Sequence, residues 1–181
     1  KPYQPAGLWK ALAHPASNTK EYQRDKGPLL YRRSLYLYWK RTSPHPMMIL
    51  FDAPDRESSC VRRSRTSTPL QSLALLNETQ RVEIGRSLAE RLLREESDDA
   101  ERFNKLYRLL ACREPNALEM AASADLLEKM RERYADDLDA ATDFLSIGDA
   151  PRDETLDVQD HAAWTQVALT VLASDLALLL F

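Results

Sequence analysis

Three arginines stand shortly before Thr68, a residue type that commonly caps the start of a helix: Arg62, Arg63 and Arg65. A guanidinium group binds a carboxylate, phosphate or sulfate through two parallel hydrogen bonds, and the free backbone amides at a helix start favour the same anions. The spacing therefore indicates an anion-binding surface. Ion pairing within the chain is the commoner role of such a cluster. The neighbouring acidic partners for such pairs are Asp52, Asp55 and Glu57.

Other basic and aromatic residues gather in the same part of the chain, between Tyr31 and Asn77. Its aromatic rings could stack on sugars or on a partner protein, although such rings more often pack at the edge of a core. The aromatic residues in question are Tyr36, Tyr38 and Trp39. The candidate binding residues are Arg32, Arg33, Trp39, Lys40, Arg41, Arg56, Arg62, Arg63 and Arg65.

No pattern in the chain matches a catalytic or metal-binding motif. Asp52, Asp55 and Glu57 could supply an acid/base pair, but carboxylates so close in sequence need not converge on a substrate. Cys60 and Cys112 form no CxxC pair, and the three histidines lie in separate regions. We therefore predict no catalytic residue, no metal site and no cofactor in this chain, and we favour a nonenzymatic role.

Charge is distributed unevenly along the 181 residues. Residues 1–80 contain 13 basic and 6 acidic residues, a net +7, whereas residues 81–181 contain 12 basic and 22 acidic residues, a net −10. The two halves could neutralise each other within one fold, or the basic half could bind an anionic partner. Because the total charge is −3 and no nucleic-acid-binding motif is recognised, we predict that this partner is not a nucleic acid.

The composition is typical of a globular protein, with 44% hydrophobic and 29% charged residues. The most apolar stretch, residues 167–181, is shorter than the roughly 20 residues that a membrane-spanning helix needs, and Asp175 interrupts it. The sequence therefore predicts a buried terminal helix and no membrane span.

A small extended region is predicted near the start of the chain. Residues 31–39 alternate between two sets of side chains and are rich in aromatics, a pattern that favours a strand. The short apolar run 47–51 follows two prolines and could pair with it. We expect a two-stranded antiparallel arrangement here.

Helices are predicted from Thr68 onward. Thr68 with Gln71, and Asn116 with Glu119, follow the capping pattern in which each residue bonds the other's backbone. Asn77 with Gln80, Ser97 or Asp98, and Asp157 are further helix starts, while Gly148 is a typical residue after a helix end. The predicted fold is mainly α, an antiparallel bundle of about four or five helices.

The domain organisation predicted is a single mainly α domain over residues 1–181. Residues 1–67 form its basic, loop- and strand-rich subregion, and residues 68–181 form the helical bundle. The chain opens on KPYQPAGLW with no recognisable leader, so we expect it to be the C-terminal part of a longer polypeptide.

Several uncommon strings occur in a fixed order: KPYQPAGLW from Lys1, YRRSLY from Tyr31, WKRT from Trp39, FDAP from Phe51, DRE from Asp55, RR-S-RT-S-TPLQSLALLN from Arg62 and PRDETLD from Pro151. Together they resemble a planctomycete-specific domain of unknown function, which ends large secreted proteins that also carry cytochrome-c-like domains. The resemblance implies an extracytoplasmic, multidomain protein with sister domains as partners. It also implies that any c-type haem lies elsewhere in the parent protein.

We predict from these observations a noncatalytic structural or interaction module, whose arginine-rich segment docks sister domains. One alternative is a binding module for anionic polysaccharide, using Arg62, Arg63, Arg65 and Lys40 with Trp39. A third is part of an enzyme site completed by residues outside this chain, which predicts a cleft lined by Asp52, Arg56 and Glu57.

Overall fold

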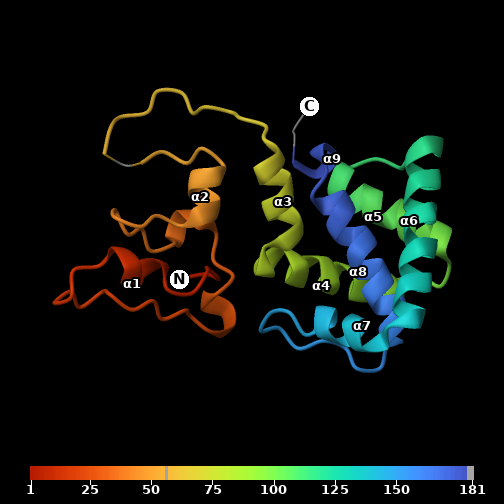
Figure 1. Ribbon diagram of the computed structural model, residues 1–181. Coiled ribbons are helices and arrows are strands. Elements are labelled where there is room, and N and C mark those ends of the chain that lie inside the picture. Colours follow the sequence, from red (N-terminus) through yellow and green to blue (C-terminus); the bar gives the residue numbers. More distant parts are fainter. Residues whose placement is uncertain (56, 179–181) are drawn as a thin grey trace. The chain divides into compact units, whose positions relative to one another are not determined.

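The computed structural model describes residues 1–55 and 57–178, and every regular element in these ranges is a helix or a 3₁₀ turn. The predicted mainly helical class is therefore confirmed. The chain divides into two compact units, the first formed by Lys1–Ala74 and the second beginning at Leu75. Figure 1 labels the helices of both units. The single-domain assignment of residues 1–181 stays a prediction.

The first unit holds its chain together with few regular elements. Its helices are α1 (Leu8–Leu12), α2 (Pro46–Leu50) and α3 (Pro69–Asn77), the last of which continues into the second unit. Two 3₁₀ turns, Gly27–Leu29 and Ser34–Tyr36, lie between α1 and α2. The buried hydrophobic residues of this unit are Tyr3, Trp9 and Leu30.

The two strands predicted at 31–39 and 47–51 are wrong, because neither stretch contains strand structure. Pro46 occupies the first position of helix α2, where its fixed φ and missing N–H suit a helix rather than a ladder. Within 31–39 the alternation marks no buried face, because the neighbours Leu35 and Tyr36 are 68% and 62% exposed. A 3₁₀ turn replaces the strand, with the Leu37 N–H donating to the Ser34 carbonyl at 3.2 Å.

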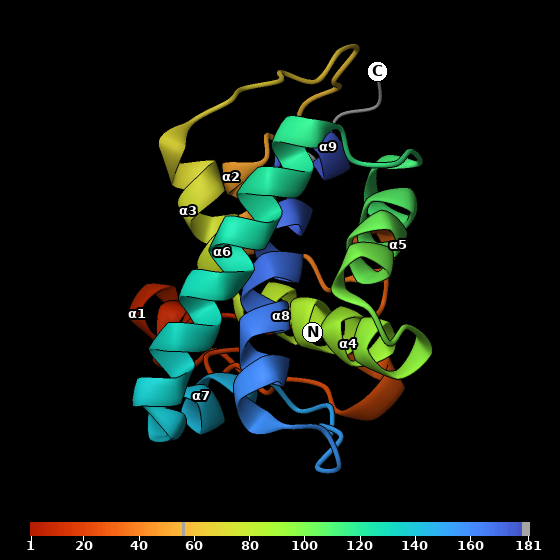
Figure 2. The same cartoon turned by 90° about the vertical axis from the view of Figure 1, so that its right-hand side faces the viewer.

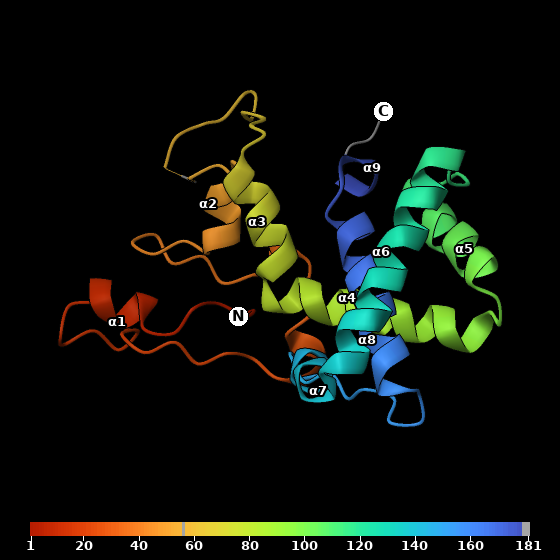
Figure 3. The same cartoon turned by 45° about the vertical axis from the view of Figure 1, so that its right-hand side comes forward.

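The second unit is a helical assembly around one buried helix. Its elements are α4 (Thr79–Glu95), α5 (Asp99–Ala111), α6 (Ala117–Asp136), α7 (Leu138–Leu145), α8 (Val158–Leu172) and α9 (Asp175–Leu178). Helix α8 lies at the centre, where Trp164 and Val167 are fully buried, and α4, α6 and α7 pack against it. Figures 2 and 3 show α6 and α8 running alongside each other while α4 crosses α8.

Close approach of α4 and α8 depends on a glycine. A side chain at Gly85 would place its Cβ 3.2 Å from the Cβ of Leu169, tighter than most packed contacts. The number of helices in the described ranges exceeds the four or five predicted. One reason is that the helix is interrupted between α3 and α4, and another is that α9 adds a single extra turn.

Most predicted helix starts are confirmed. The backbone N–H of Thr68 donates to the Gln71 side chain at 2.9 Å, and the N–H of Gln71 donates to the Thr68 hydroxyl at 3.3 Å. Asn116 with Glu119 forms the same reciprocal box, and Asp98 and Asp157 cap α5 and α8. The helix restart predicted at Asn77 is confirmed one residue later, since α3 ends at Asn77 and Glu78 accepts the N–H of Arg81 to start α4.

No helix in the described ranges has both the length and the apolar character that crossing a membrane requires.

Candidate functional site

The arginine-rich segment, residues 57–68, links α2 to α3 in the first unit and is exposed throughout. Figure 1 shows it as an extended stretch, coloured yellow, without helix or strand. Hydrogen bonds to residues around α2 and α3 hold the middle of the segment and its end near α3. Of its three arginines, one takes part in these hydrogen bonds and two do not.

Arg63 is an anchor. Its Nε donates to the Asp52 carbonyl at 3.1 Å, and its Nη2 donates to the Phe51 carbonyl at 2.9 Å. These carbonyls directly follow the last turn of α2, where backbone acceptors have no partner within the helix. The guanidinium therefore satisfies the end of α2 and holds the middle of the segment against it.

Asp52 fixes the far end of the segment. Its carboxylate accepts the Thr66 N–H at 2.9 Å and the Thr66 hydroxyl at 2.7 Å, while Asp52 itself adopts a left-handed backbone with φ of 54°. These hydrogen bonds, from the hydroxyl first and the amide second, hold the pKa of Asp52 below its usual value. Gln71 completes the join, donating to the Leu50 carbonyl at 2.8 Å and to the Thr66 hydroxyl at 2.9 Å.

Arg62 and Arg65 are different. Both side chains are exposed, and neither makes a hydrogen bond or ion pair with any residue that the structure describes. The ion pairs predicted between these arginines and the neighbouring carboxylates are therefore not formed there. The segment thus presents two uncommitted guanidinium groups on a backbone that Arg63 and Thr66 hold in place.

The nearby carboxylates have other partners. Asp55 accepts the backbone N–H groups of Glu57 and Ser58 at 2.9 and 3.2 Å. Glu57 pairs with Arg41 at 3.1 Å, with side chains 54% and 80% exposed. A surface pair of this kind is worth little to stability.

The remaining candidate residues are spread over the first unit. Lys40 donates to the Thr19 carbonyl at 2.6 Å and its Nζ lies 4.3 Å from the centre of the Trp9 ring, so its ammonium is already engaged. Trp39 is partly buried, while Arg32 and Arg33 are exposed beside the Ser34–Tyr36 turn. Arg56 lies outside the described residues.

Sequence reasoning missed a buried polar cluster in the second unit. Arg86 and Glu83, on α4, are each 2% exposed. Arg86 donates to the carbonyls of Leu145, Ile147 and Ala150, and the Ala150 N–H donates to the Glu83 carboxylate. The pair thereby clamps the loop between α7 and α8 onto α4. The only local signal is two charged residues beside an apolar helical stripe, a pattern that usually indicates a solvated face.

His161 lies in the same cluster and is fully buried. Its Nε2 is 3.5 Å from the Arg86 carbonyl oxygen and 3.8 Å from Glu90 Oε1, and burial lowers its pKa. Its Nδ1 is buried without a hydrogen-bond partner among the described atoms. These contacts make the cluster a structural clamp, since its charged groups are directed at the chain's own backbone.

The cysteine and histidine side chains do not cluster into a site. Cys60 and Cys112 are free, exposed thiols. Across residues 1–55 and 57–178, no three His, Cys, Asp or Glu side chains are placed to hold one metal ion.

A protein-family model matches most of the chain. Residues 1–127, more than two thirds of the chain, match the family model described as PSD1: Protein of unknown function (DUF1553). The match covers the first unit and the second as far as the middle of α6, and it includes the arginine-rich segment. No curated protein and no solved structure matches the chain.

Proposed function

Because the chain belongs to the PSD1 (DUF1553) family of proteins of unknown function, we propose its role from the arginine-rich segment: a noncatalytic interaction module that docks onto an acidic surface of a neighbouring domain. Arg62 and Arg65 carry the contact. Arg63 and Asp52 hold the segment in the form that binds.

The observation behind the proposal is the difference between these arginines. Arg63 directs its donors at two backbone carbonyls of the same unit, whereas Arg62 and Arg65 are exposed and form no hydrogen bond or ion pair within the described residues. A guanidinium fork matches a carboxylate with two parallel hydrogen bonds. Anchoring the segment at Arg63 and Thr66 reduces the conformational entropy lost when these forks bind a partner.

The enzymatic alternative receives less support from the same residues. A general acid at neutral pH needs a raised pKa, but the hydrogen bonds from Thr66 lower the pKa of Asp52 and favour its ionised form. Asp52 also holds the loop, so its carboxylate is committed to structure.

We further propose that the partner is a sister domain of the same polypeptide, that this polypeptide is extracytoplasmic, and that any c-type haem lies in another of its domains. The support is the order of the strings from KPYQPAGLW to TPLQSLALLN, which resembles a domain found in such proteins.

The test is a binding measurement between the full chain and each other domain that its gene encodes. Replacing both Arg62 and Arg65 by alanine should weaken the complex at least about tenfold, since arginines at the centre of an interface contribute more than about 1 kcal/mol each. Replacing Lys10 and Lys26 by alanine removes the same charge from the same unit and serves as the matched control.

Added salt should weaken the wild-type complex, because salt screens the attraction between exposed charges and the screening length is about 10 Å at 0.1 M ionic strength. The docking role is refuted if no other encoded domain binds, or if the double arginine variant binds as tightly as the lysine control.

A further inference from the structure

A second surface of the first unit is a groove of about 550 Å³ beside α1 and the loop that follows it. The residues that line it include Trp9 and Tyr38, the basic residues Lys1 and Lys20, and the polar residues Asn18 and Glu21. The lining therefore combines aromatic, cationic and neutral hydrogen-bonding groups in one concave place.

The aromatic part of the groove is packed at its base and open at its edge. Trp9 is 3% exposed, and the Tyr22 ring meets it edge-on with the ring centres 4.8 Å apart. Tyr38 packs beside Trp9 with centres 5.5 Å apart, yet 51% of Tyr38 remains exposed. The groove thus offers a fixed aromatic ring to a ligand without needing a rearrangement of the core.

Cations are held against these rings. The Lys1 Nζ lies 5.8 Å from the Trp9 centre and 5.7 Å from the Tyr38 centre, within the range of a cation–π contact. Lys40 sits over Trp9 and donates to the Thr19 carbonyl, which fixes the loop that carries Asn18 and Lys20. Glu21 is the one acidic residue among the described residues of the lining, so these residues together carry a net positive charge.

We propose that this groove binds an anionic pyranose, a sugar ring that carries a carboxylate or a sulfate. The apolar C–H face of a pyranose packs on an aromatic ring such as Tyr38. Its hydroxyls need donors and acceptors of the kind that Asn18 and Glu21 supply, and its acidic substituent is attracted to Lys1 and Lys20.

This site is separate in its residues from the docking segment. The arginines of that segment supply charge and hydrogen-bond donors, but residues 57–68 contain no aromatic ring. The groove supplies a ring, hydroxyl partners and charge together, which is the combination that distinguishes a sugar from a simple anion.

The experiment is calorimetric titration of the full chain with three probes: hexagalacturonate, a sulfated heparin hexasaccharide and neutral maltohexaose. We expect saturable binding of one or both acidic probes, weakened by salt, and much weaker binding of maltohexaose. The two acidic probes distinguish a carboxylate ligand from a sulfate ligand.

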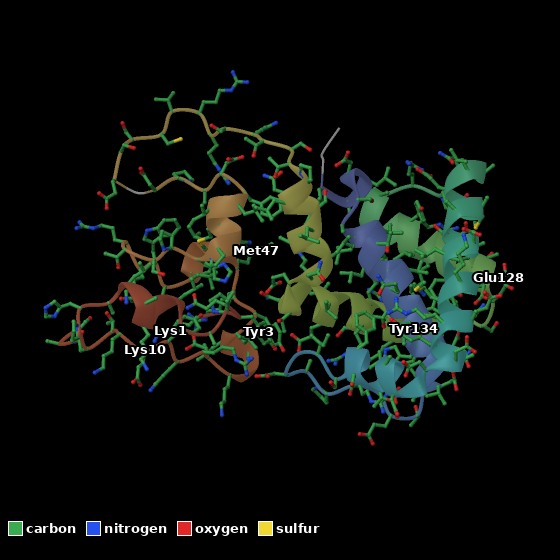
Figure 4. All side chains as sticks on the ribbon, in the orientation of Figure 1. Lys1, Tyr3, Lys10, Met47, Glu128 and Tyr134 are labelled. Carbon is green, nitrogen blue, oxygen red and sulfur yellow. The ribbon has the colours of Figure 1, made fainter. Side chains whose placement is uncertain are left out.

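Two variants with matched controls locate the site. Tyr38→Ala should lower the affinity about three- to tenfold, whereas Tyr36→Ala, which removes a ring that is 62% exposed but outside the groove lining, should leave it unchanged. Lys20→Ala should weaken the acidic probes and reduce the salt dependence, whereas Lys10→Ala should do neither. Figure 4 labels Lys1, which lines the groove, and Lys10, which does not.

Three results would overturn the proposal. The first is no saturable binding of either acidic probe. The second is an equal loss for Tyr36→Ala and Tyr38→Ala, which indicates contact with the surface at large. The third is a loss confined to the Arg62 and Arg65 variants, which assigns the sugar to the arginine-rich segment. Thermal unfolding of each variant confirms that the fold is retained.

Discussion

Replacing Arg86 by methionine should strongly destabilise the second unit. The substitution keeps the apolar stem in the core but removes the guanidinium group. Three carbonyl oxygens, of Leu145, Ile147 and Ala150, then lose their charged donor, and the Glu83 carboxylate stays buried without the nearby positive charge.

The magnitude follows from burial. Hydrogen bonds to a charged group contribute about 1.5–3 kcal/mol each, but the three bonds share one group and do not add. Removing one partner of a buried ion pair costs about 3–5 kcal/mol. Since the Arg86 and Glu83 side chains are both 3% exposed, solvent offers little compensation, and we expect a loss of about 3–5 kcal/mol in unfolding free energy.

Urea unfolding followed by circular dichroism at 222 nm measures this loss. The matched control is Arg91→Met on the same helix, where the side chain is 53% exposed and pairs with Glu95 one turn away. That change should stay within the roughly 0.5 kcal/mol typical of surface substitutions. Hydrogen exchange should also show the amides of residues 146–153 losing protection in the Arg86 variant alone.

An Arg86→Met protein that unfolds within about 0.5 kcal/mol of the Arg91 control would refute the assignment of Arg86 as the clamp of the α7–α8 loop. Equal protection of residues 146–153 in the two variants would lead to the same conclusion.

Three further changes test the remaining assignments. Burial lowers the pKa of His161 below its ordinary value of 6.5, so the unfolded chain binds the proton more readily than the folded chain. The unfolding free energy should therefore fall as the pH drops from about 6.5 toward 5, by at most about 1.4 kcal/mol per pH unit. In urea unfolding, His161→Gln should remove this pH dependence, whereas His14→Gln at an exposed position should keep it. Gly148→Ala should lower the unfolding free energy by about 1–3 kcal/mol, because φ is +99° and the new Cβ would lie 2.8 Å from Glu83 Cδ. The control is Gly7→Ala, where φ is +83° but the new Cβ meets open space, so thermal unfolding should show only the smaller loss due to backbone strain. Arg63→Ala should lower the melting temperature of the first unit, because it removes two hydrogen bonds, while Arg62→Ala and Arg65→Ala should leave that temperature unchanged. Equal shifts for all three variants would contradict the division of these arginines into anchor and contact residues.

Local signals in the sequence predict the parts of the fold that depend on near neighbours. The boxes at Thr68 and at Asn116 each join residues three positions apart, so the pattern alone locates them. The predicted strands fail for a related reason. Residues 31–39 do alternate, but a strand also needs a partner and a buried face, and Leu35 and Tyr36 are both exposed.

Long-range contacts explain what the sequence leaves unassigned. Arg62 and Arg63 are adjacent and chemically identical, and only the position of the last turn of α2 makes one an anchor and leaves the other uncommitted. In the second unit, Arg86 bonds carbonyls about 60 positions away, at Leu145 and Ile147. No pattern of spacing contains that information.

The excess of arginine in residues 57–68 cannot be attributed to local neutralisation. Of the three carboxylates nearest in sequence, Asp52 accepts from Thr66, Asp55 accepts from the Glu57 and Ser58 amides, and Glu57 pairs with Arg41. Two exposed like charges three positions apart gain nothing from each other, because like charges repel. Anchoring by Arg63 and Thr66 holds this stretch in place, while Arg62 and Arg65 stay exposed without a partner among the described residues. These two observations are the physical support for the docking surface proposed above.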